Sequence, residues 1–156
     1  MDTRIPELSN REIKSHFIQA NKTTRRRSPL ILHQKGDYLN KVFNFILEDS
    51  YMHPHLHPSD EKIENMYLIK GSFGLIEFDN KGNINKTTIL KEGNLTSIKV
   101  PAFTWHTYVM LSQENIVYET MEGKYEPNSW KKMAPWAPIE ESNQAPSYLQ
   151  ELKSSL

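Results

Sequence analysis

The residues of this chain with the clearest chemical potential lie in a short histidine-rich stretch at positions 53–57. Residues two apart on an extended strand project from the same face, so His55 and His57 can direct both imidazoles at one point. Glu64 follows shortly afterwards, and His106 comes much later in the chain. Three neutral imidazoles and one carboxylate form a ligand set that suits a transition-metal ion.

The metal prediction depends on more than the paired histidines. Alternation along a strand often produces two histidines on one face, so the pair alone is weak support. The sequence contains no cysteine, which excludes disulfides and thiolate metal sites. The expected cofactor is one divalent transition metal, namely Fe, Mn, Ni, Co or Zn, provided that the fold brings Glu64 and His106 to the same point.

One helix is expected near the amino terminus, over roughly residues 9 to 21. Ser9 is followed three residues later by Glu12, which is the form of a capping box. An apolar stripe then follows, formed by Ile13, Phe17 and Ile18. A helix this short is marginal alone, so we expect it to pack on a barrel or on a second subunit.

Short runs rich in β-branched and aromatic residues dominate the middle of the chain and alternate with turn-forming residues. They span residues 30–32, 42–47, 66–69, 73–78, 87–90, 96–100, 107–111 and 116–120. Strands at this spacing without intervening helices predict an antiparallel sandwich or barrel. Beyond residue 123, prolines and tryptophans indicate an irregular segment that wraps the barrel, with residues 147–152 as the candidate for a last helical turn.

A length of 156 residues favours a single domain. We expect an N-terminal helical arm over residues 1–25, a barrel over residues 26–140 and a C-terminal tail over residues 141–156. Lysine and arginine number 19 together, as do aspartate and glutamate, so no general field attracts nucleic acid or an anionic membrane. We therefore expect neither nucleic acid nor a membrane as a partner. The chain also opens without a basic segment followed by an apolar run, so we expect a cytoplasmic protein.

Placed on a β-barrel, the metal-binding candidates resemble the two motifs of the cupin superfamily. His55, His57, Glu64 and Gly71 follow the order of the first motif, and residues 93–106 resemble the second. The resemblance implies an all-β, cupin-type jelly-roll barrel. It also implies that His55, His57, Glu64 and His106 hold the metal.

The chain departs from the general cupin pattern at two places. The gap between His57 and Glu64 is longer than usual, so Glu61 is an alternative ligand. Glu64 is preferred because its distance to Gly71 matches the family. Phe103 stands where a glycine is typical.

A closer resemblance, over nearly the whole chain, is to the WbuC-type cupin-fold metalloproteins associated with bacterial O-antigen gene clusters. It is carried by residues 26–29, His33, Asp37, residues 50–51, 54–57, 78–82 and 105–106, Glu119, residues 123–127 and 134–138, and Glu140. Leu30 and Ile31 depart from it, because polar residues are expected there. The resemblance implies a setting in surface-polysaccharide biosynthesis without supplying a reaction.

These observations predict a metal-dependent enzyme that acts on a small polar or anionic ligand, such as a sugar or nucleotide sugar, as an isomerase, epimerase or oxygenase. The alternative is a non-catalytic, metal-containing cupin that binds a small ligand as a sensor. We expect a homodimer that forms through the N-terminal helix or an edge strand.

Three residues are candidates for catalysis. Glu119 is near the site by family analogy and can act as an acid or base if burial raises its pKa. Tyr125 is a weaker candidate of the same kind. The forked guanidinium of Arg27 suits a phosphate or carboxylate of the substrate, although the run of residues 25–27 also has the ordinary interpretation of a solvated basic connector.

Overall fold

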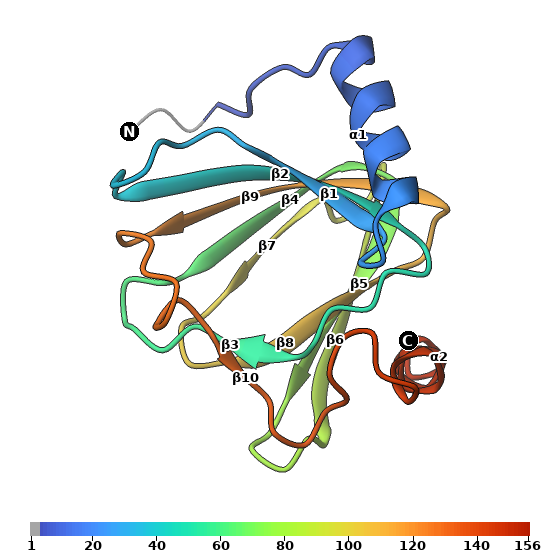
Figure 1. The fold of residues 1–156 in the computed structure, drawn as a ribbon. Coiled ribbons are helices and arrows are strands. Elements are labelled where there is room, and N and C mark those ends of the chain that lie inside the picture. The colour runs from blue at the N-terminus through green and yellow to red at the C-terminus, as the bar shows by residue number, and fades with distance from the viewer. Residues whose placement is uncertain (1–3) are drawn as a thin grey trace.

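The computed structural model describes residues 4–156, and they form two antiparallel sheets that face each other as a jelly-roll barrel (Figure 1). The first sheet has the strand order β1-β2-β9-β4-β7, and the second has the order β10-β3-β8-β5-β6. The elements are α1 (Asn10–Lys22), β1 (Arg27–Ile31), β2 (Leu39–Leu47), β3 (His55–Leu56), β4 (Glu64–Lys70), β5 (Ser72–Phe78), β6 (Ile84–Lys91), β7 (Ser97–Val100), β8 (Trp105–Met110), β9 (Glu114–Glu122), β10 (Lys132–Met133) and α2 (Ala145–Ser154).

Helix α1 begins at the predicted capping box. The Ser9 hydroxyl accepts a hydrogen bond from the Glu12 backbone, and the Glu12 carboxylate accepts one from the Ser9 backbone, both at 3.1 Å. Phe17 is buried among aromatic and aliphatic residues on the outer face of β2 and β9, edge-on to Phe45 at 5.5 Å. The helix therefore has its packing partner within its own chain, whereas Ile18 remains 47% exposed.

The inward-facing side chains of both sheets are polar at one end of the barrel and apolar at the other. Along β4 the inward-facing positions change from Glu64 to Leu68, and along β8 they change from His106 to Met110. Each change occurs within one strand because alternate residues share a face. The apolar end closes the barrel, which leaves the polar residues grouped at the other end.

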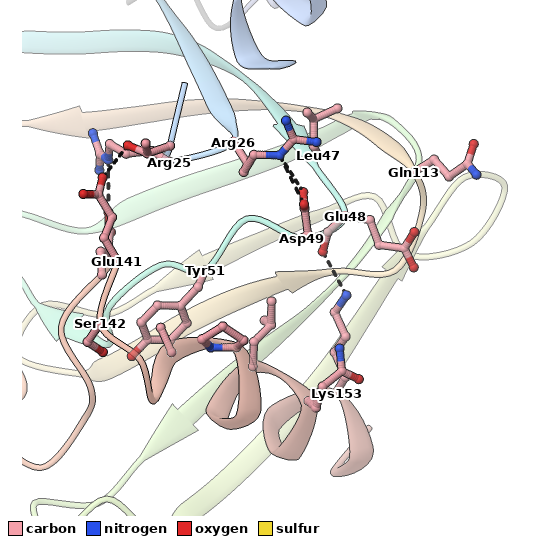
Figure 2. A pocket seen from close by; sticks show the side chains of 16 residues that line it. Arg25, Arg26, Leu47, Glu48, Asp49, Tyr51, Gln113, Glu141, Ser142 and Lys153 are labelled. Atoms are coloured by element: carbon pink, nitrogen blue, oxygen red, sulfur yellow. Dashed lines mark hydrogen bonds and ion pairs between the residues drawn. The ribbon is translucent and has the colours of Figure 1, made fainter. Parts of the chain in front are cut away.

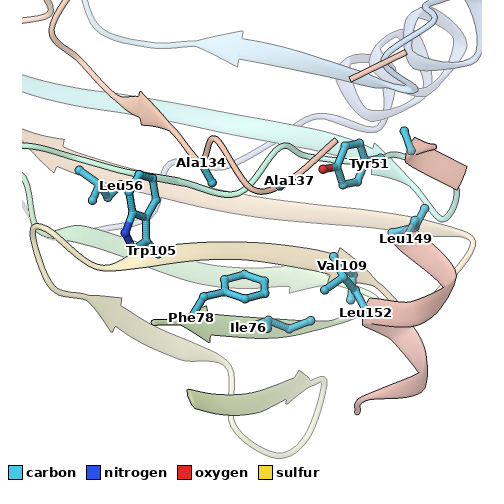
Figure 3. Close-up of a cluster of buried hydrophobic side chains, with 11 residues drawn as sticks. Tyr51, Leu56, Ile76, Phe78, Trp105, Val109, Ala134, Ala137, Leu149 and Leu152 are labelled. Carbon is cyan, nitrogen blue, oxygen red and sulfur yellow. The ribbon is translucent and has the colours of Figure 1, made fainter. Parts of the chain in front are cut away.

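The C-terminal segment covers the outer face of the second sheet. Leu149 and Leu152 of α2 pack with Val109 and Ile76 in one buried cluster (Figure 3). The helix is longer than the turn predicted at residues 147–152. Neither helix within residues 4–156 combines the length and hydropathy needed to cross a bilayer.

All the predicted runs overlap an observed strand, and two short strands lie outside them. These are β3 and β10, which pair with each other so that Leu56 lies opposite Lys132 and His55 lies opposite Met133. Strands of two residues carry too little alternation to be recognised in a sequence. Their pairing brings the C-terminal segment directly beside the histidine-rich stretch.

Candidate metal centre

Three regions of the barrel bring the predicted ligands together. His55 lies on β3 directly opposite His106 of β8, and Glu64 is the first residue of β4. One ligating atom from each of His55, His57, Glu64 and His106 lies within 4.8 Å of the others, and all four side chains are buried. Nε2 of His106 lies 2.8 Å from Oε2 of Glu64, and Nε2 of His57 lies 3.4 Å from the same oxygen.

Each of the three histidines also contacts a backbone carbonyl oxygen, and this contact sets the orientation and tautomer of the ring. In every case Nδ1 lies within hydrogen-bond distance of a backbone carbonyl oxygen: His55 to His53 at 3.0 Å, His57 to Trp130 at 2.9 Å, and His106 to Thr104 at 2.8 Å. A carbonyl oxygen only accepts hydrogen bonds, so Nδ1 must donate and a neutral ring presents the Nε2 lone pair to the centre.

The donor set fits a cation. In the neutral tautomer, Nε2 of His106 and Oε2 of Glu64 are both acceptors, yet they lie 2.8 Å apart. Such a contact is favourable only with a proton or a metal ion between the two atoms. Nε2 of His57 is buried and forms no hydrogen bond within residues 4–156, which is costly for a polar atom. A divalent metal bound here would satisfy all of these atoms at once.

The electrostatic environment favours the ligand forms of two of these side chains. Burial raises the pKa of Glu64, but the hydrogen bond with His106 and the close approach of His106 and His57 outweigh burial and hold this pKa well below its ordinary value. Burial and the neighbouring His106 lower the pKa of His55 well below its ordinary value. Near neutral pH, Glu64 is therefore ionised and His55 is neutral, as metal binding requires.

Glu119 faces the barrel interior from β9, opposite Met66 of β4. Its carboxylate accepts a hydrogen bond from the Tyr108 hydroxyl. Burial and the negative charge of Glu64 raise the pKa of Glu119 to about 8. Glu119 is a predicted site residue and Tyr108 is not, although Tyr108 lies two residues after His106 and therefore shares its strand face.

Arg27 is buried, so the interpretation of residues 25–27 as a solvated connector is wrong for this residue. Its Nη2 lies 2.7 Å from Glu140, and its Nη1 donates to Ser50 Oγ and to the Tyr51 carbonyl, both at 3.2 Å. Arg26 is directed at Asp49 instead, as Figure 2 shows. Both terminal nitrogens of Arg27 thus donate inside the protein, and a direct contact with a ligand stays a prediction.

The remaining predicted residues lie outside the metal cluster. Tyr125 is half exposed and packs edge-on against Trp130, with ring centroids 5.1 Å apart. Trp130 in turn lies between Tyr125 and the ring of His57, whose centroid is 6.1 Å away. Glu61 is exposed and accepts a hydrogen bond from Ser59, so it does not replace Glu64 in the cluster.

Lys62 is a further residue at this site, and it was not among the residues predicted from the sequence. It is buried, donates to the Ser129 carbonyl at 2.9 Å, and places its ammonium 4.8 Å from the centre of the Trp130 ring. These contacts hold the segment that supplies the carbonyl acceptor of His57. No local spacing connects residue 62 with residue 130, because only the tertiary structure brings them together.

The inner surface next to the cluster is open on the β1 side. Val42, Asn44 and Glu119 face the barrel interior and are only partly buried, and Ile31, opposite Val42, is 59% exposed. A separate cavity of about 760 Å³ lies between residues 24–26, the β2–β3 connection and α2 (Figure 2). None of the four cluster residues lines that cavity, so the open inner surface is the better candidate for a ligand site.

Several solved structures have the same fold. SO0799 from Shewanella oneidensis aligns with a TM-score of 0.58 at 10% identity, over 71% of this chain and 75% of that chain. CapF from Staphylococcus aureus, a capsular polysaccharide assembling protein, aligns with a TM-score of 0.56 at 16% identity, over 68% of this chain and 29% of that chain. Oxalate decarboxylase from Bacillus subtilis, described with Mn(II) centres, aligns with a TM-score of 0.53 at 15% identity, over 69% of this chain and 28% of that chain.

These likenesses confirm the predicted all-β, cupin-type jelly roll. The chain spans less than a third of the length of CapF and of oxalate decarboxylase. No curated protein matches the chain. A family model matches residues 8–90, a stretch that runs from the residue before Ser9 into β6, and the chain therefore belongs to the family described as a domain of unknown function (DUF6016).

Proposed function

We propose that this protein is a metal-dependent enzyme that holds one divalent transition metal with His55, His57, Glu64 and His106. One observation carries the proposal: three imidazoles, each held at Nδ1 by a backbone carbonyl, direct Nε2 at a single region beside the Glu64 carboxylate. A cluster that served only packing would not need all three rings in the same tautomer. A metal bound here would act as a Lewis acid and polarise an oxygen atom of the bound small molecule.

The residues around the cluster support proton transfer beside the metal. In the metal-free protein Glu119 has a pKa of about 8, first because it is buried, and a carboxyl whose pKa burial raises can accept or release a proton closer to neutral pH than an exposed one. The Tyr108 hydroxyl, from β8 in the facing sheet, donates a hydrogen bond that holds this carboxyl in place. Tyr125 lies further out, behind Trp130, and would contact only the outer part of a ligand.

We propose a small sugar derivative, such as a nucleotide sugar, as the substrate, and an isomerase, epimerase or oxygenase reaction. The WbuC-type resemblance supports a role in O-antigen or related surface-polysaccharide biosynthesis in the cytoplasm. The description of CapF as a capsular polysaccharide assembling protein is consistent with that setting, although the likeness itself extends only to the fold.

A non-catalytic, metal-containing sensor is the second candidate. It is favoured by the burial of the cluster, whose four residues are each no more than 5% exposed. A metal so enclosed can hold a small ligand or stabilise the barrel without turning over a substrate. The two candidates share the metal and differ in whether a bound ligand is changed.

Metal analysis and turnover together test the proposal. Protein purified without chelator should contain close to one equivalent of a transition metal by elemental analysis. Protein loaded with Fe(II), Mn(II) or Zn(II) is then incubated with a panel of nucleotide sugars and followed by mass spectrometry. Turnover supports the enzyme, saturable thermal shifts without turnover support the sensor, and failure to retain any of these metals contradicts both.

We also propose a homodimer, formed through an edge strand of the barrel. α1 already packs on its own barrel, so the exposed strand β6 at the edge of the second sheet is the better candidate for the contact. Light scattering at micromolar concentration tests this proposal, and a monomeric mass would contradict it.

A further inference from the structure

Cationic side chains gather where the edge strands β1 and β10 approach the metal centre. Glu140 accepts from Nη2 of Arg27 at 2.7 Å with one oxygen and from Nε of Arg25 at 3.0 Å with the other. Both carboxylate oxygens are therefore engaged by arginines. The third cation, Lys131, forms no hydrogen bond or ion pair with any residue in the range 4–156.

The pairing of β10 with β3 indicates the direction in which Lys131 points. Lys132 lies opposite Leu56 and places its ammonium 5.9 Å from the centre of the Trp105 ring, on the outer face of the second sheet. Adjacent residues of a strand project to opposite faces. Lys131 therefore projects to the inner face, and continuing the register by one residue places it opposite His57.

A second contact places Lys131 beside the metal centre. The carbonyl of the preceding residue, Trp130, accepts the hydrogen bond from Nδ1 of His57. Electrostatic coupling agrees with this position, because the charge of Lys131 contributes to lowering the pKa of His55. The pKa of Lys131 is itself lowered, first by burial and then by the like charges of Arg25 and Arg27.

We propose that the Lys131 ammonium binds a phosphoryl group of a ligand whose other end lies at the metal centre. Arg25 and Arg27 already share Glu140, whereas Lys131 has no hydrogen-bonding or ion-pairing partner within residues 4–156. A dianionic phosphoryl group would give Lys131 a charged partner, which a neutral sugar does not. Lys131 thus takes the role predicted for Arg27, whose two terminal nitrogens already donate to other groups. This inference rests on the proposed function in one respect, because the proposed metal would bind the other end of the same ligand.

Calorimetry on the zinc-loaded protein tests the inference with two probes that differ by one group, phosphoglycolate and glycolate. Wild-type protein should bind phosphoglycolate about tenfold more tightly, since the phosphoryl group adds a charge-assisted hydrogen bond. Lys131→Met should abolish this preference while zinc content stays unchanged, and Lys131→Arg should retain part of it. Lys132→Met is the matched control and should bind both probes as wild type does.

A second measurement separates this inference from the proposed metal. Competitive acetylation of metal-free wild-type protein, read by mass spectrometry, should show that inorganic phosphate protects Lys131 and leaves Lys132 reactive. Protection in a protein that retains no metal would support the phosphoryl site and contradict the proposed function. An unchanged probe preference in a zinc-loaded Lys131→Met variant, or no protection of Lys131 by phosphate, would overturn the inference whatever the metal result.

Discussion

His57 donates its Nδ1 hydrogen to the backbone carbonyl of Trp130 across 2.9 Å. This contact joins the metal cluster to the segment between β9 and β10, which is otherwise largely exposed. The segment leaves the barrel at Gly123, whose carbonyl accepts from the Asn40 side chain at 2.6 Å and whose positive φ of 105° suits glycine. The orientation of the His57 ring, a candidate metal ligand, therefore depends on a segment far away in the sequence.

Lys62→Met should weaken metal binding without unfolding the barrel. The ammonium of Lys62 holds Ser129 and lies over Trp130, so its loss should loosen the carbonyl that orients His57. We expect roughly tenfold weaker zinc affinity, measured by competition with a chromogenic chelator. Lys70→Met is the control, because its ammonium lies over the Phe17 ring on the outer face, and equal loss in both variants would contradict this role.

Replacing a metal-binding residue of the cluster should abolish metal binding, whereas replacing Glu61, the alternative to Glu64, should not. His57→Ala should abolish stoichiometric metal binding, whereas Glu61→Gln should retain it, because Glu61 is exposed and lies outside the cluster. Metal at a concentration of about 100 times its Kd should stabilise the wild type by about 2.7 kcal/mol. Differential scanning fluorimetry with and without metal checks this, and identical melting temperatures would argue against a site.

Glu119 should make the metal-free protein less stable as the pH rises. Its pKa is about 8 in the folded protein against an ordinary value of 4.5, so between these values the unfolded carboxyl loses its proton while the folded one keeps it. The unfolded state then binds fewer protons, and the free energy of unfolding falls as pH increases.

Urea unfolding between pH 5 and pH 8.5 tests this expectation. Glu119→Gln should flatten the decline of the metal-free protein across this range. Bound metal should also reduce it, because a cation beside Glu64 offsets the negative charge that contributes to raising the pKa of Glu119. Equal slopes in the wild type and the variant would show that Glu119 does not carry the proton.

Glu140 should have the opposite dependence on pH. Burial raises its pKa, but the charges and hydrogen bonds of Arg27 and Arg25 outweigh burial and hold the pKa below the ordinary value of 4.5. The folded state therefore gains stability from this carboxylate above pH 4.5, and the gain is lost as the pH falls through the lowered pKa.

Glu140→Gln should lower the free energy of unfolding by about 2 kcal/mol at pH 7, since Arg27 would lose its charged partner. The difference from wild type should shrink as the pH falls through the lowered pKa of Glu140, because the wild-type carboxyl then becomes uncharged like the glutamine. Glu141→Gln is the control, because this exposed carboxylate contacts Thr24 and not the buried guanidinium. A difference that stays constant with pH would show that the ion pair is not the cause.

Local chemistry made several features of this protein predictable. Ser9 and Glu12 are three residues apart, which is the spacing that a helix cap requires, and α1 begins there. His55 and His57 are separated by one residue, so an extended backbone places both rings on one face. The turn-separated runs also predicted antiparallel strands, because connections too short to contain a helix join strands that run in opposite directions.

The tertiary structure decided which residues meet. Pairing of β3 with β8 brings His106 to His55, and pairing of β10 with β3 brings Trp130 and Lys131 to the same place. Spacing along the chain contains no information on strand order, so Lys62, Trp130 and Lys131 could not be connected with the metal cluster in advance. The same holds for Arg27, whose burial depends on a carboxylate more than a hundred residues away.

The amino-acid sequence by itself thus determined the ligand types and the strand face that carries two of them, because both depend on residues next to each other in the chain. The choice of Glu64 over Glu61 at the cluster required the fold, since Glu64 begins β4 opposite Val100 while Glu61 stays in the exposed turn before it. Hydrogen bonding between strands selects the inward position, and it acts between residues distant in sequence.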